Sequence, residues 1–287
     1  MKRTTRTKLR NAKIIDNHVH LSIHPESRAK IGYLEDSMRK NGIDLAVALA
    51  AYFPRKTGSI SNGEALSLAE KYENILIFGS LDAEHNFENG TLELESLLRR
   101  KKIFGIKLYP GYQYFYPNEK KLDAIYELAS KFNVPVMFHS GLAYRSPGGI
   151  RFSRPIYIDD VAGSFQSMKI VISHLGDPSI REATAVAHKN PNVYLDFSGL
   201  VSNTTKNQER AERWQKLNEE YIARTVADVL TDLMGTEKII FGSDWPISSH
   251  EKSLALVSRL QKMLNLDREE VERMLSKNML KVLGIMK

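Results

Sequence analysis

Eight short apolar runs rich in Val, Ile and Phe alternate along the chain with segments of helical periodicity, and this alternation constrains the fold more than any other feature. Repeated strand and helix units of this kind are typical of a parallel sheet that is covered by helices. Eight repeats in 287 residues favour a closed (β/α)8 barrel, the TIM barrel, over an open doubly wound sheet. The first run is not followed by a GxGxxG motif, which also argues against a dinucleotide-binding fold.

The predicted strands and the segments between them extend over the whole chain. No linker has the Ser/Gly-rich composition of a domain boundary, so residues 1–287 are predicted to form one domain. Three longer connections, at residues 109–117, 142–157 and 201 to about 221, follow strands four, five and seven, on the face where barrel enzymes carry their active sites. We predict the strands at residues 14–20, 44–50, 75–82, 105–109, 135–139, 169–174, 193–197 and 238–244.

Composition narrows the class of function. The chain has no cysteine, which excludes disulfides and thiolate metal sites and leaves histidine and carboxylate as the strong metal ligands. The net charge of +7 is spread along the sequence, so nucleic-acid binding is not predicted. No apolar run approaches the roughly 18 residues needed to span a bilayer, and the basic N-terminal residues lead into a strand. We therefore expect a cytoplasmic protein with no membrane partner.

Four of the eight histidines fall at the carboxyl ends of predicted strands. His18 and His20 end strand one, and because side chains alternate along a strand, both project to the same side. His139 ends strand five, His174 ends strand six, and Asp244 ends strand eight, which barrel closure brings beside strand one. An HxH pair alone is weak support for a metal site, but the convergence of five such groups on one face predicts one.

The chemistry of these side chains points to a divalent ion. Imidazoles from His18, His20 and His139 and the carboxylate of Asp244 form an N/O site suited to Zn²⁺, or to Mn²⁺ or Fe²⁺. An ion held in this way acidifies a bound water molecule and polarises a carbonyl group. His174 is then predicted to act as a general base or acid, or, in the alternative with two metal ions, as a ligand.

Lys107, at the end of strand four, is predicted to point into the same mouth. It could bind a substrate carboxylate, act as an acid, or be carbamylated to bridge two metal ions, while the structural alternative is that it reaches solvent. The remaining histidines, His24, His85, His188 and His250, fall in predicted loops or helices and are expected to be solvated.

The longer connections carry groups that could bind a small-molecule substrate. In residues 142–157, Arg145 and Arg154 flank a flexible SPGG segment and are predicted to bind an anionic substrate, with surface solvation as the alternative. Tyr109 begins an aromatic-rich loop that could line the pocket or pack a subunit interface. Residues 207–230 predict a long charged helix, either a cap over the mouth or a dimer contact. We expect a homodimer or a higher homo-oligomer.

Six motifs distributed over nearly the whole chain resemble those of the amidohydrolase superfamily, in particular its amidohydrolase-related group, which includes hydrolases, lactonases and decarboxylases. The motifs are IIDNHVH, GIKLYP, VPVMFHSG, KIVISHLG, IIFGSDWP and the closing SKNMLKVLGI. GSDWP looks more like the lactonase branch, whereas the strand-four lysine resembles the carbamylated residue of the binuclear branch. The resemblance implies that the metal ligands are His18, His20, His139 and Asp244, that His174 activates water or substrate, and that Asp244 also takes a proton from the water.

Three classes of function follow from these features. The first is hydrolysis of an amide, ester or lactone of a small molecule, including anionic ones, by metal-activated water. The second is nonoxidative decarboxylation of a small aromatic or unsaturated carboxylic acid, in which a protonated group delivers H⁺ to carbon. The third, a non-catalytic binding protein, is disfavoured because a complete ligand set has little structural reason to persist in a barrel that its core already stabilises.

Overall fold

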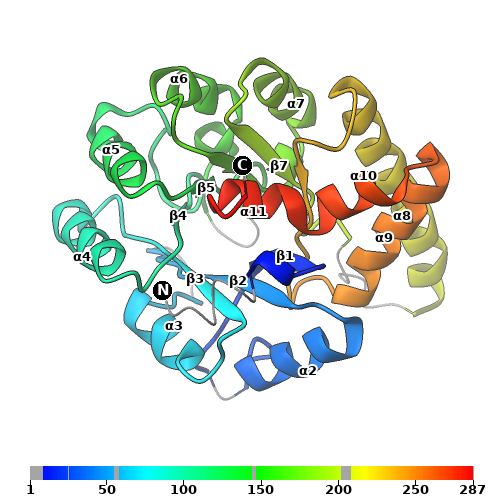
Figure 1. Cartoon of the computed structure of the whole chain (residues 1–287), viewed down its shortest axis with the longest axis horizontal. Helices are drawn as coiled ribbons and strands as arrows, with labels where there is room; N and C mark the ends of the chain where they lie inside the picture. The colour runs from blue at the N-terminus through cyan, green and yellow to red at the C-terminus, as the bar shows by residue number, and fades with distance from the viewer. Residues whose placement is uncertain (1–8, 25, 55–57, 144–146, 202–207, 287) are drawn as a thin grey trace.

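The computed structural model describes residues 9–286 apart from residues 25, 55–57, 144–146 and 202–207. Its eight strands pair in parallel and in sequence order, with helices between successive strands (Figure 1). The predicted (β/α)8 barrel is therefore confirmed. The strands are β1 (Ile15–Val19), β2 (Leu45–Leu49), β3 (Ile75–Gly79), β4 (Gly105–Leu108), β5 (Val136–Phe138), β6 (Ile170–Ile172), β7 (Val193–Asp196) and β8 (Ile239–Ile240).

The strands are shorter than the sequence predicts. The prediction places His174 and Asp244 inside strands six and eight, but β6 ends at Ile172 and β8 ends at Ile240. Both residues lie where the backbone leaves the extended conformation, because φ is 58° at His174 and 68° at Asp244. A left-handed backbone cannot continue a strand. Turns, rather than strands, therefore present these two residues.

The barrel closes between β1 and the segment that follows β8. Asp244 N donates to His18 O at 2.8 Å, and His20 N donates to Trp245 O at 2.8 Å. These bonds join the two ends of the sequence at the mouth of the barrel. Strands one and eight are thus neighbours, as predicted, although main-chain hydrogen bonds to the loop after β8 make much of the contact with β1.

Helices surround the sheet, and the last of them crosses one end of the barrel (Figure 1). α8 matches the long charged helix predicted at residues 207–230, because it begins at Gln208 and ends at Asp232. Within the described part of the chain, no helix is both long and apolar enough to cross a membrane. The helices are α2 (Ile31–Asn41), α3 (Asn62–Ala69), α4 (Phe87–Arg99), α5 (Asp123–Phe132), α6 (Ile156–Ser164), α7 (Ile180–Lys189), α8 (Gln208–Asp232), α9 (His250–Leu264), α10 (Arg268–Glu272) and α11 (Asn278–Val282).

Alternate residues of the strands belong to two separate apolar cores. In β2, Leu45 and Val47 pack inside the barrel with Met137 of β5, whereas Ala46 and Ala48 pack toward the helices. This is the period-of-two arrangement expected of a barrel strand. The inner core continues into α11, which closes the end opposite the histidines. The mouth at the other end is left for the polar side chains.

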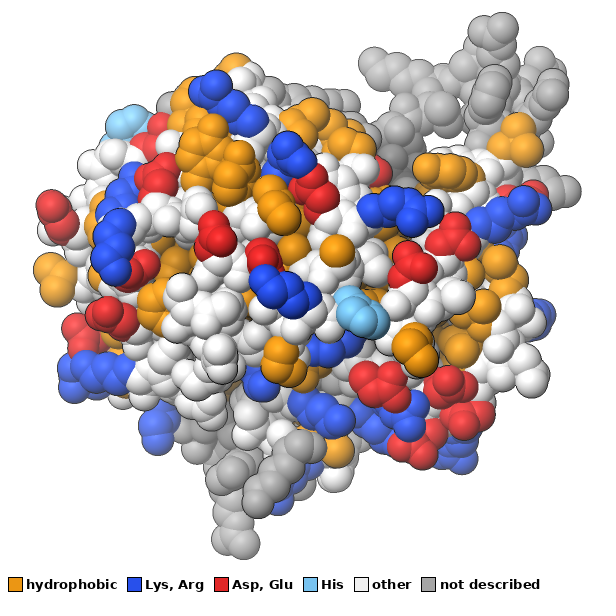
Figure 2. Space-filling view, turned by 90° about the horizontal axis from the view of Figure 1, so that it is seen from above, with side chains coloured by type: hydrophobic (Ala, Val, Ile, Leu, Met, Phe, Trp, Pro, Cys, Tyr) orange, Lys and Arg blue, Asp and Glu red, His pale blue; other side chains and the backbone are white. Residues whose placement is uncertain are grey.

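Charged side chains are mixed on the outer surface. On the face shown in Figure 2, Lys and Arg side chains lie among Asp and Glu side chains, and the described residues form no continuous basic surface there. Charged side chains on the helices also pair locally, as Arg99 does with Glu95 on α4 and Arg224 does with Glu220 on α8. The net positive charge is therefore dispersed over this face.

Candidate metal centre

The end of β1 carries the two histidines of the HxH pair. The pairing of β1 with β2 shifts register between Asp16 and Val19, so Ile15 packs into the inner core while Val19 packs toward the helices. An irregularity of this kind re-aims the side chains around it. His18 and His20 consequently both line the cavity at the mouth, with ring centroids 5.3 Å apart.

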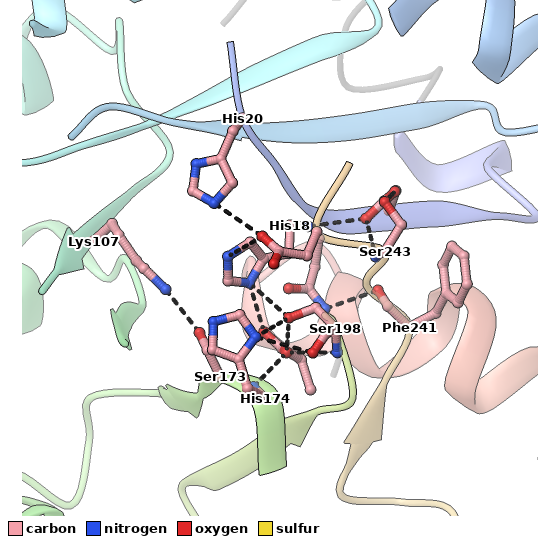
Figure 3. Close-up of polar contacts among 12 residues, drawn as sticks. His18, His20, Lys107, Ser173, His174, Ser198, Phe241 and Ser243 are labelled. Atoms are coloured by element: carbon pink, nitrogen blue, oxygen red, sulfur yellow. Dashed lines mark hydrogen bonds and ion pairs between the residues drawn. The ribbon is translucent and has the colours of Figure 1, made fainter. Parts of the chain in front are cut away.

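His18, His20 and Asp244 bring three candidate ligand atoms together (Figure 3). Asp244 Oδ1 lies 3.0 Å from His20 Nε2 and 3.6 Å from His18 Nε2. All three atoms lie within 4.8 Å of one another. His18 and Asp244 are buried, with 1% and 6% of their surfaces exposed, whereas His20 is partly exposed. The fold thus gathers three of the predicted ligands from opposite ends of the chain.

A divalent ion would satisfy the polar atoms of this group better than hydrogen bonds among them do. Asp244 Oδ1 is buried but accepts no well-aligned hydrogen bond from the residues that the structure describes, although two imidazole nitrogens face it. Gly199 keeps the space beside the carboxylate open, because a Cβ there would lie 2.8 Å from Asp244 Oδ2. Imidazole nitrogen and carboxylate oxygen are donors that suit Zn²⁺, Mn²⁺ and Fe²⁺.

His139, the fourth predicted ligand, follows β5 and lies on another wall of the same cavity. It is 4% exposed. Its ring centroid lies 5.1 Å from that of His174 and 4.6 Å from that of Tyr112. Among the described residues, the compact group of ligand atoms contains the other three predicted ligands and not His139. His139 therefore shares the cavity but stands further from that group.

Asp196, the last residue of β7, was missed by the sequence analysis. His18 Nδ1 lies 3.1 Å from Asp196 Oδ2 and 3.0 Å from Ser198 Oγ. A carboxylate beside Nδ1 keeps the proton on that nitrogen and leaves Nε2 free to bind a metal ion. The criterion that selected the histidines, a polar residue at the carboxyl end of a strand, would have selected Asp196 as well.

Burial sets the protonation of His18 and Asp196. Desolvation lowers the pKa of His18 to about 4, and the positive charge of Lys107 acts in the same direction. Burial alone would raise the pKa of Asp196, but the charge of His18 and its hydrogen bond outweigh that effect and hold the pKa well below its usual range. At neutral pH the pair is thus a neutral imidazole beside a carboxylate, as a metal ligand requires.

His174 presents one ring nitrogen to the cavity (Figure 3). Its Nδ1 lies 2.9 Å from Ser198 O. A carbonyl oxygen can only accept, so Nδ1 carries the proton and Nε2 keeps its lone pair. The backbone N of His174 donates to Asp196 Oδ1 at 3.0 Å, which holds the strained turn in place. The geometry therefore provides a base that faces the cavity.

A second group of candidate ligand atoms belongs to His18, His174 and Asp196. Ser198 Oγ donates to Asp196 Oδ1 at 2.5 Å and lies 3.0 Å from His18 Nδ1 and 2.9 Å from His174 Nδ1. Because these atoms already satisfy one another, the group is a hydrogen-bonded cluster. This cluster therefore does not need an ion to satisfy its polar atoms.

Lys107 lies inside the barrel. It is fully buried, and its Nζ donates to Ser173 Oγ at 2.8 Å (Figure 3). Burial lowers the pKa of Lys107 to about 7, against the opposite effect of Asp196 and Asp244. The lysine adjoins His174 through the neighbouring Ser173. The alternative in which Lys107 reaches solvent is therefore wrong.

The metal centre opens into a cavity of about 150 Å³. Tyr109 is buried against one wall, where its Oη donates to Ala50 O at 3.1 Å, and the ring of Phe53 packs against it at 5.0 Å. The lining of the cavity thus combines the histidines and Asp244 with aromatic and aliphatic side chains. The apolar lining residues are Leu21, Ala51, Phe53, Ile60, Tyr109, Tyr112 and Ile247.

Arg154, one of the two arginines predicted to bind an anionic substrate, lies away from this cavity. Arg154 forms an ion pair with Glu182 of α7, its side chain is 46% exposed, and it does not line the cavity as the described residues define it. The anion-binding role expected of Arg154 therefore has no geometric support, because a neighbouring carboxylate already takes the guanidinium group. Arg145 lies outside the described residues.

The other four histidines divide between surface and core. His24, His85 and His188 are exposed, as predicted. His250 contradicts the prediction, because it is fully buried with its Nδ1 2.8 Å from Ser37 Oγ. The sequence places His250 at the start of a helix, and this position alone does not predict its contact with α2.

Comparison with known proteins identifies the family to which this barrel belongs. The chain belongs to the amidohydrolase family, whose model matches residues 15–285. This is a family of metal-dependent enzymes, so its membership indicates that the chain is an enzyme. No match was found among curated protein sequences.

Solved structures of the same fold come from several bacteria. An uncharacterized TIM-barrel protein from Bordetella bronchiseptica is 20% identical, with a TM-score of 0.67 over 95% of this chain and 98% of the other. The 5-carboxyvanillate decarboxylase of Novosphingobium aromaticivorans, complexed with manganese, is 13% identical, with a TM-score of 0.63 over 96% of each chain. The dihydroorotase of Campylobacter jejuni is 17% identical, with a TM-score of 0.60 over 95% of this chain and 83% of the other. At such low identity the similarity concerns the fold.

Proposed function

We propose that this protein is a metal-dependent hydrolase that cleaves an amide, ester or lactone of a small molecule with metal-activated water. The observation that carries the proposal is the convergence of His18 Nε2, His20 Nε2 and Asp244 Oδ1 in a cavity that His174 also lines. A ligand set with a base beside it is the minimum that such a hydrolysis needs.

Different residues would hold the ion, accept the proton and orient the ligands. His18, His20 and Asp244 would hold the ion, with His139 on the neighbouring wall of the cavity. When bound there, a divalent ion acidifies water and polarises a carbonyl group. His174 accepts a proton at Nε2, because Ser198 O keeps the other proton on Nδ1. Asp196 keeps His18 in the tautomer that binds through Nε2.

The cavity supports a small and partly apolar substrate. A cavity of about 150 Å³ has the volume of a single small ring. Tyr109 and Phe53 provide flat apolar surface in the lining of the same cavity. An acyl group or lactone bearing an apolar substituent matches this mixed lining of polar and apolar groups.

The aromatic wall favours a second candidate, nonoxidative decarboxylation of a small aromatic acid. Tyr109, Tyr112 and Phe53 pack edge to face or tilted and would enclose a planar ring. The N. aromaticivorans decarboxylase of the same fold was solved with manganese and a nitrobenzoic acid. This candidate uses the same metal ligands, so only the product distinguishes it from hydrolysis.

A panel assay separates the two reactions. Purified protein loaded with Zn²⁺ or Mn²⁺ would be offered aryl esters, lactones, amides and hydroxybenzoate-type acids, with acid release and CO₂ release recorded separately. We expect acid release from at least one ester, lactone or amide. CO₂ release from an aromatic acid, with no hydrolysis anywhere in the panel, would replace the first proposal with the second.

His174→Asn tests the base directly. The variant should keep its metal content, because His174 is outside the compact ligand group, and should lose at least about a hundredfold in kcat. Metal analysis and steady-state rates on the same preparation measure both. His20→Ala serves as the comparison, since the loss of one of the three grouped ligands should lower metal content as well as rate. A His174→Asn protein with wild-type kcat would remove His174 from the reaction.

Several further properties are proposed on the sequence alone. The resident ion is proposed to be Zn²⁺, with Mn²⁺ or Fe²⁺ as the alternatives, which elemental analysis of the purified protein would decide. The protein is proposed to be a cytoplasmic homodimer or higher homo-oligomer that acts on a small molecule, without nucleic-acid or membrane partners. Light scattering in solution tests the oligomeric state.

A further inference from the structure

His250, the first residue of α9, is a fully buried histidine that the proposed reaction does not use. Its Nδ1 lies 2.8 Å from Ser37 Oγ of α2. Its ring stacks on Trp245, with centroids 6.3 Å apart and planes inclined by 14°. A buried imidazole costs free energy unless its polar atoms are engaged, so the identity of its neighbours matters.

The second ring nitrogen of His250 faces Asp16 of β1. His250 Nε2 lies 3.1 Å from Asp16 Oδ2, at ion-pair distance although not in the alignment of a good hydrogen bond. Both groups are completely shielded from solvent. An electrostatic contact of this kind is stronger in the interior than at the surface.

Asp16 joins β1 to the turn after β8, and these two segments carry the candidate metal ligands His18 and Asp244. Its Oδ1 accepts from His18 N at 3.0 Å and from Ser243 N at 2.9 Å. Its Oδ2 accepts from Ser243 Oγ at 2.5 Å (Figure 3). One carboxylate therefore fixes the backbone of a predicted ligand on β1 and the residue immediately before Asp244.

The backbone at Asp244 needs such support. Its φ of 68° is a left-handed conformation that residues other than glycine adopt only rarely. On either side, Ser243 is bound to Asp16, and Trp245 N donates to Ser243 Oγ at 2.9 Å. Trp245 in turn stacks on His250. The contacts of His250 and Asp16 thus enclose the strained turn that presents Asp244.

We propose that His250 and Asp16 are a positioning pair, which sets the relative placement of His18 and Asp244 and thereby the affinity of the site for its metal ion. The proposal rests on the metal site of the proposed function but not on the reaction performed there. Neither residue lines the cavity as the described residues define it, so neither needs to touch substrate or metal.

The test compares metal affinity with stability in three His250 network variants. His250→Leu removes both polar contacts, Ser37→Ala removes only the partner of Nδ1, and His250→Gln keeps a side-chain amide that can reach Asp16. Chelator competition measures the Zn²⁺ dissociation constant. The visible absorption spectrum of the Co²⁺-substituted protein reports the coordination geometry of the ion, and thermal unfolding measures stability. None of these readouts requires a substrate.

We expect His250→Leu to weaken Zn²⁺ binding about 10- to 100-fold and to change the Co²⁺ spectrum. Ser37→Ala should have a smaller effect in the same direction, and His250→Gln should restore most of the affinity. Asn192→Leu is the matched control for stability, because Asn192 is buried and its Nδ2 donates to three backbone carbonyls far from the site. It should lower Tm and leave Zn²⁺ affinity unchanged.

Two results would overturn the inference. Unchanged Zn²⁺ affinity and Co²⁺ spectrum in soluble His250→Leu and Ser37→Ala proteins, with only Tm lowered, would make the network purely structural. Failure of the wild-type protein to bind Zn²⁺, Mn²⁺ or Co²⁺ at all would reject this inference together with the proposed metal site. Metal binding without hydrolysis would reject the proposed reaction alone, and the affinity comparison would still decide the role of His250.

Discussion

Single residues with unusual backbone conformations surround the candidate metal centre. His174, Leu175 and Asp244 have positive φ without being glycine, and Gly199 at φ +71° lies between two of them. Strain of this kind persists only where the surroundings hold it in place, as the hydrogen bonds to Asp196 do at His174. Two of these residues, His174 and Asp244, turn a side chain into the mouth after a strand has ended.

Gly199→Ala should damage the site with little effect on the fold. The added Cβ would lie 2.8 Å from Asp244 Oδ2 and 3.1 Å from His174 Nδ1, so both side chains would have to move. We expect loss of most of the metal affinity and a fall in kcat/KM of at least about tenfold, measured with circular dichroism as the check on folding. The control is Gly63→Ala in α3, where nothing lies within 4 Å of the new Cβ. Wild-type metal affinity in Gly199→Ala would contradict the close packing described here.

Lys107 predicts a pH dependence of stability. Its pKa is lowered from 10.5 to about 7 in the folded protein, so folding disfavours its protonated form. The buried neutral amine therefore makes its full contribution to the free energy of unfolding above about pH 10.5, and this contribution is lost as the pH falls toward 7. Relative to Lys107→Met, the wild-type free energy of unfolding should rise by on the order of 3 kcal/mol between pH 7 and 10.

Urea unfolding of the metal-free proteins at several pH values measures this difference. Lys40→Met is the control, because Lys40 is exposed on α2 and should follow the wild-type profile. Parallel profiles for the wild type and Lys107→Met would show that the buried amine does not titrate in this range.

At the scale of the elements, a local signal marks the start of α3, whereas a turn in the chain marks the end of β8. α3 begins with a capping box, in which Ser61 Oγ accepts from Glu64 N at 3.3 Å and Glu64 Oε2 accepts from Ser61 N at 2.8 Å. β8 ends at Ile240, where the chain turns into the segment that carries Asp244. The start of α3 is therefore a more local feature of this sequence than the end of β8.

Ser61→Ala should destabilise the protein by about 1 kcal/mol, because it removes the acceptor for an otherwise unpaired amide at the first turn of α3. Chemical denaturation measures the change. Ser67→Ala, at an exposed position within the same helix, should be neutral or slightly stabilising. Equal effects of the two substitutions would show that the capping box contributes nothing specific.

At the scale of the whole molecule, the metal centre lies where the barrel closes. Its ligands come from both ends of the chain, and main-chain bonds link the same two segments. Binding of an ion should therefore stabilise the closed barrel rather than one local element. The opposite end is closed by α11 on the inner core (Figure 1).

Metal removal should accordingly lower the melting temperature of the whole domain. At a free ion concentration one hundred times the dissociation constant, binding adds about 2.7 kcal/mol to the free energy of unfolding, which corresponds to a rise in Tm on the order of 5 °C. Thermal unfolding with chelator and with increasing Zn²⁺ measures it. His18→Ala should abolish the response, and a response that persists in that variant would place the ion elsewhere.

The order and number of strands, the barrel and the set of histidines at its mouth could all be predicted from the sequence. Apolar periodicity is local information, and in a parallel barrel every strand delivers its carboxyl end to the same rim. The tertiary structure decided what those residues do there. Asp196 beside His18, Glu182 on Arg154 and Asp16 facing His250 are contacts between distant segments, and no local pattern encodes them. The two buried contacts, Asp196 with His18 and Asp16 with His250, arise only when closure of the barrel brings these polar groups out of water and each must find a partner.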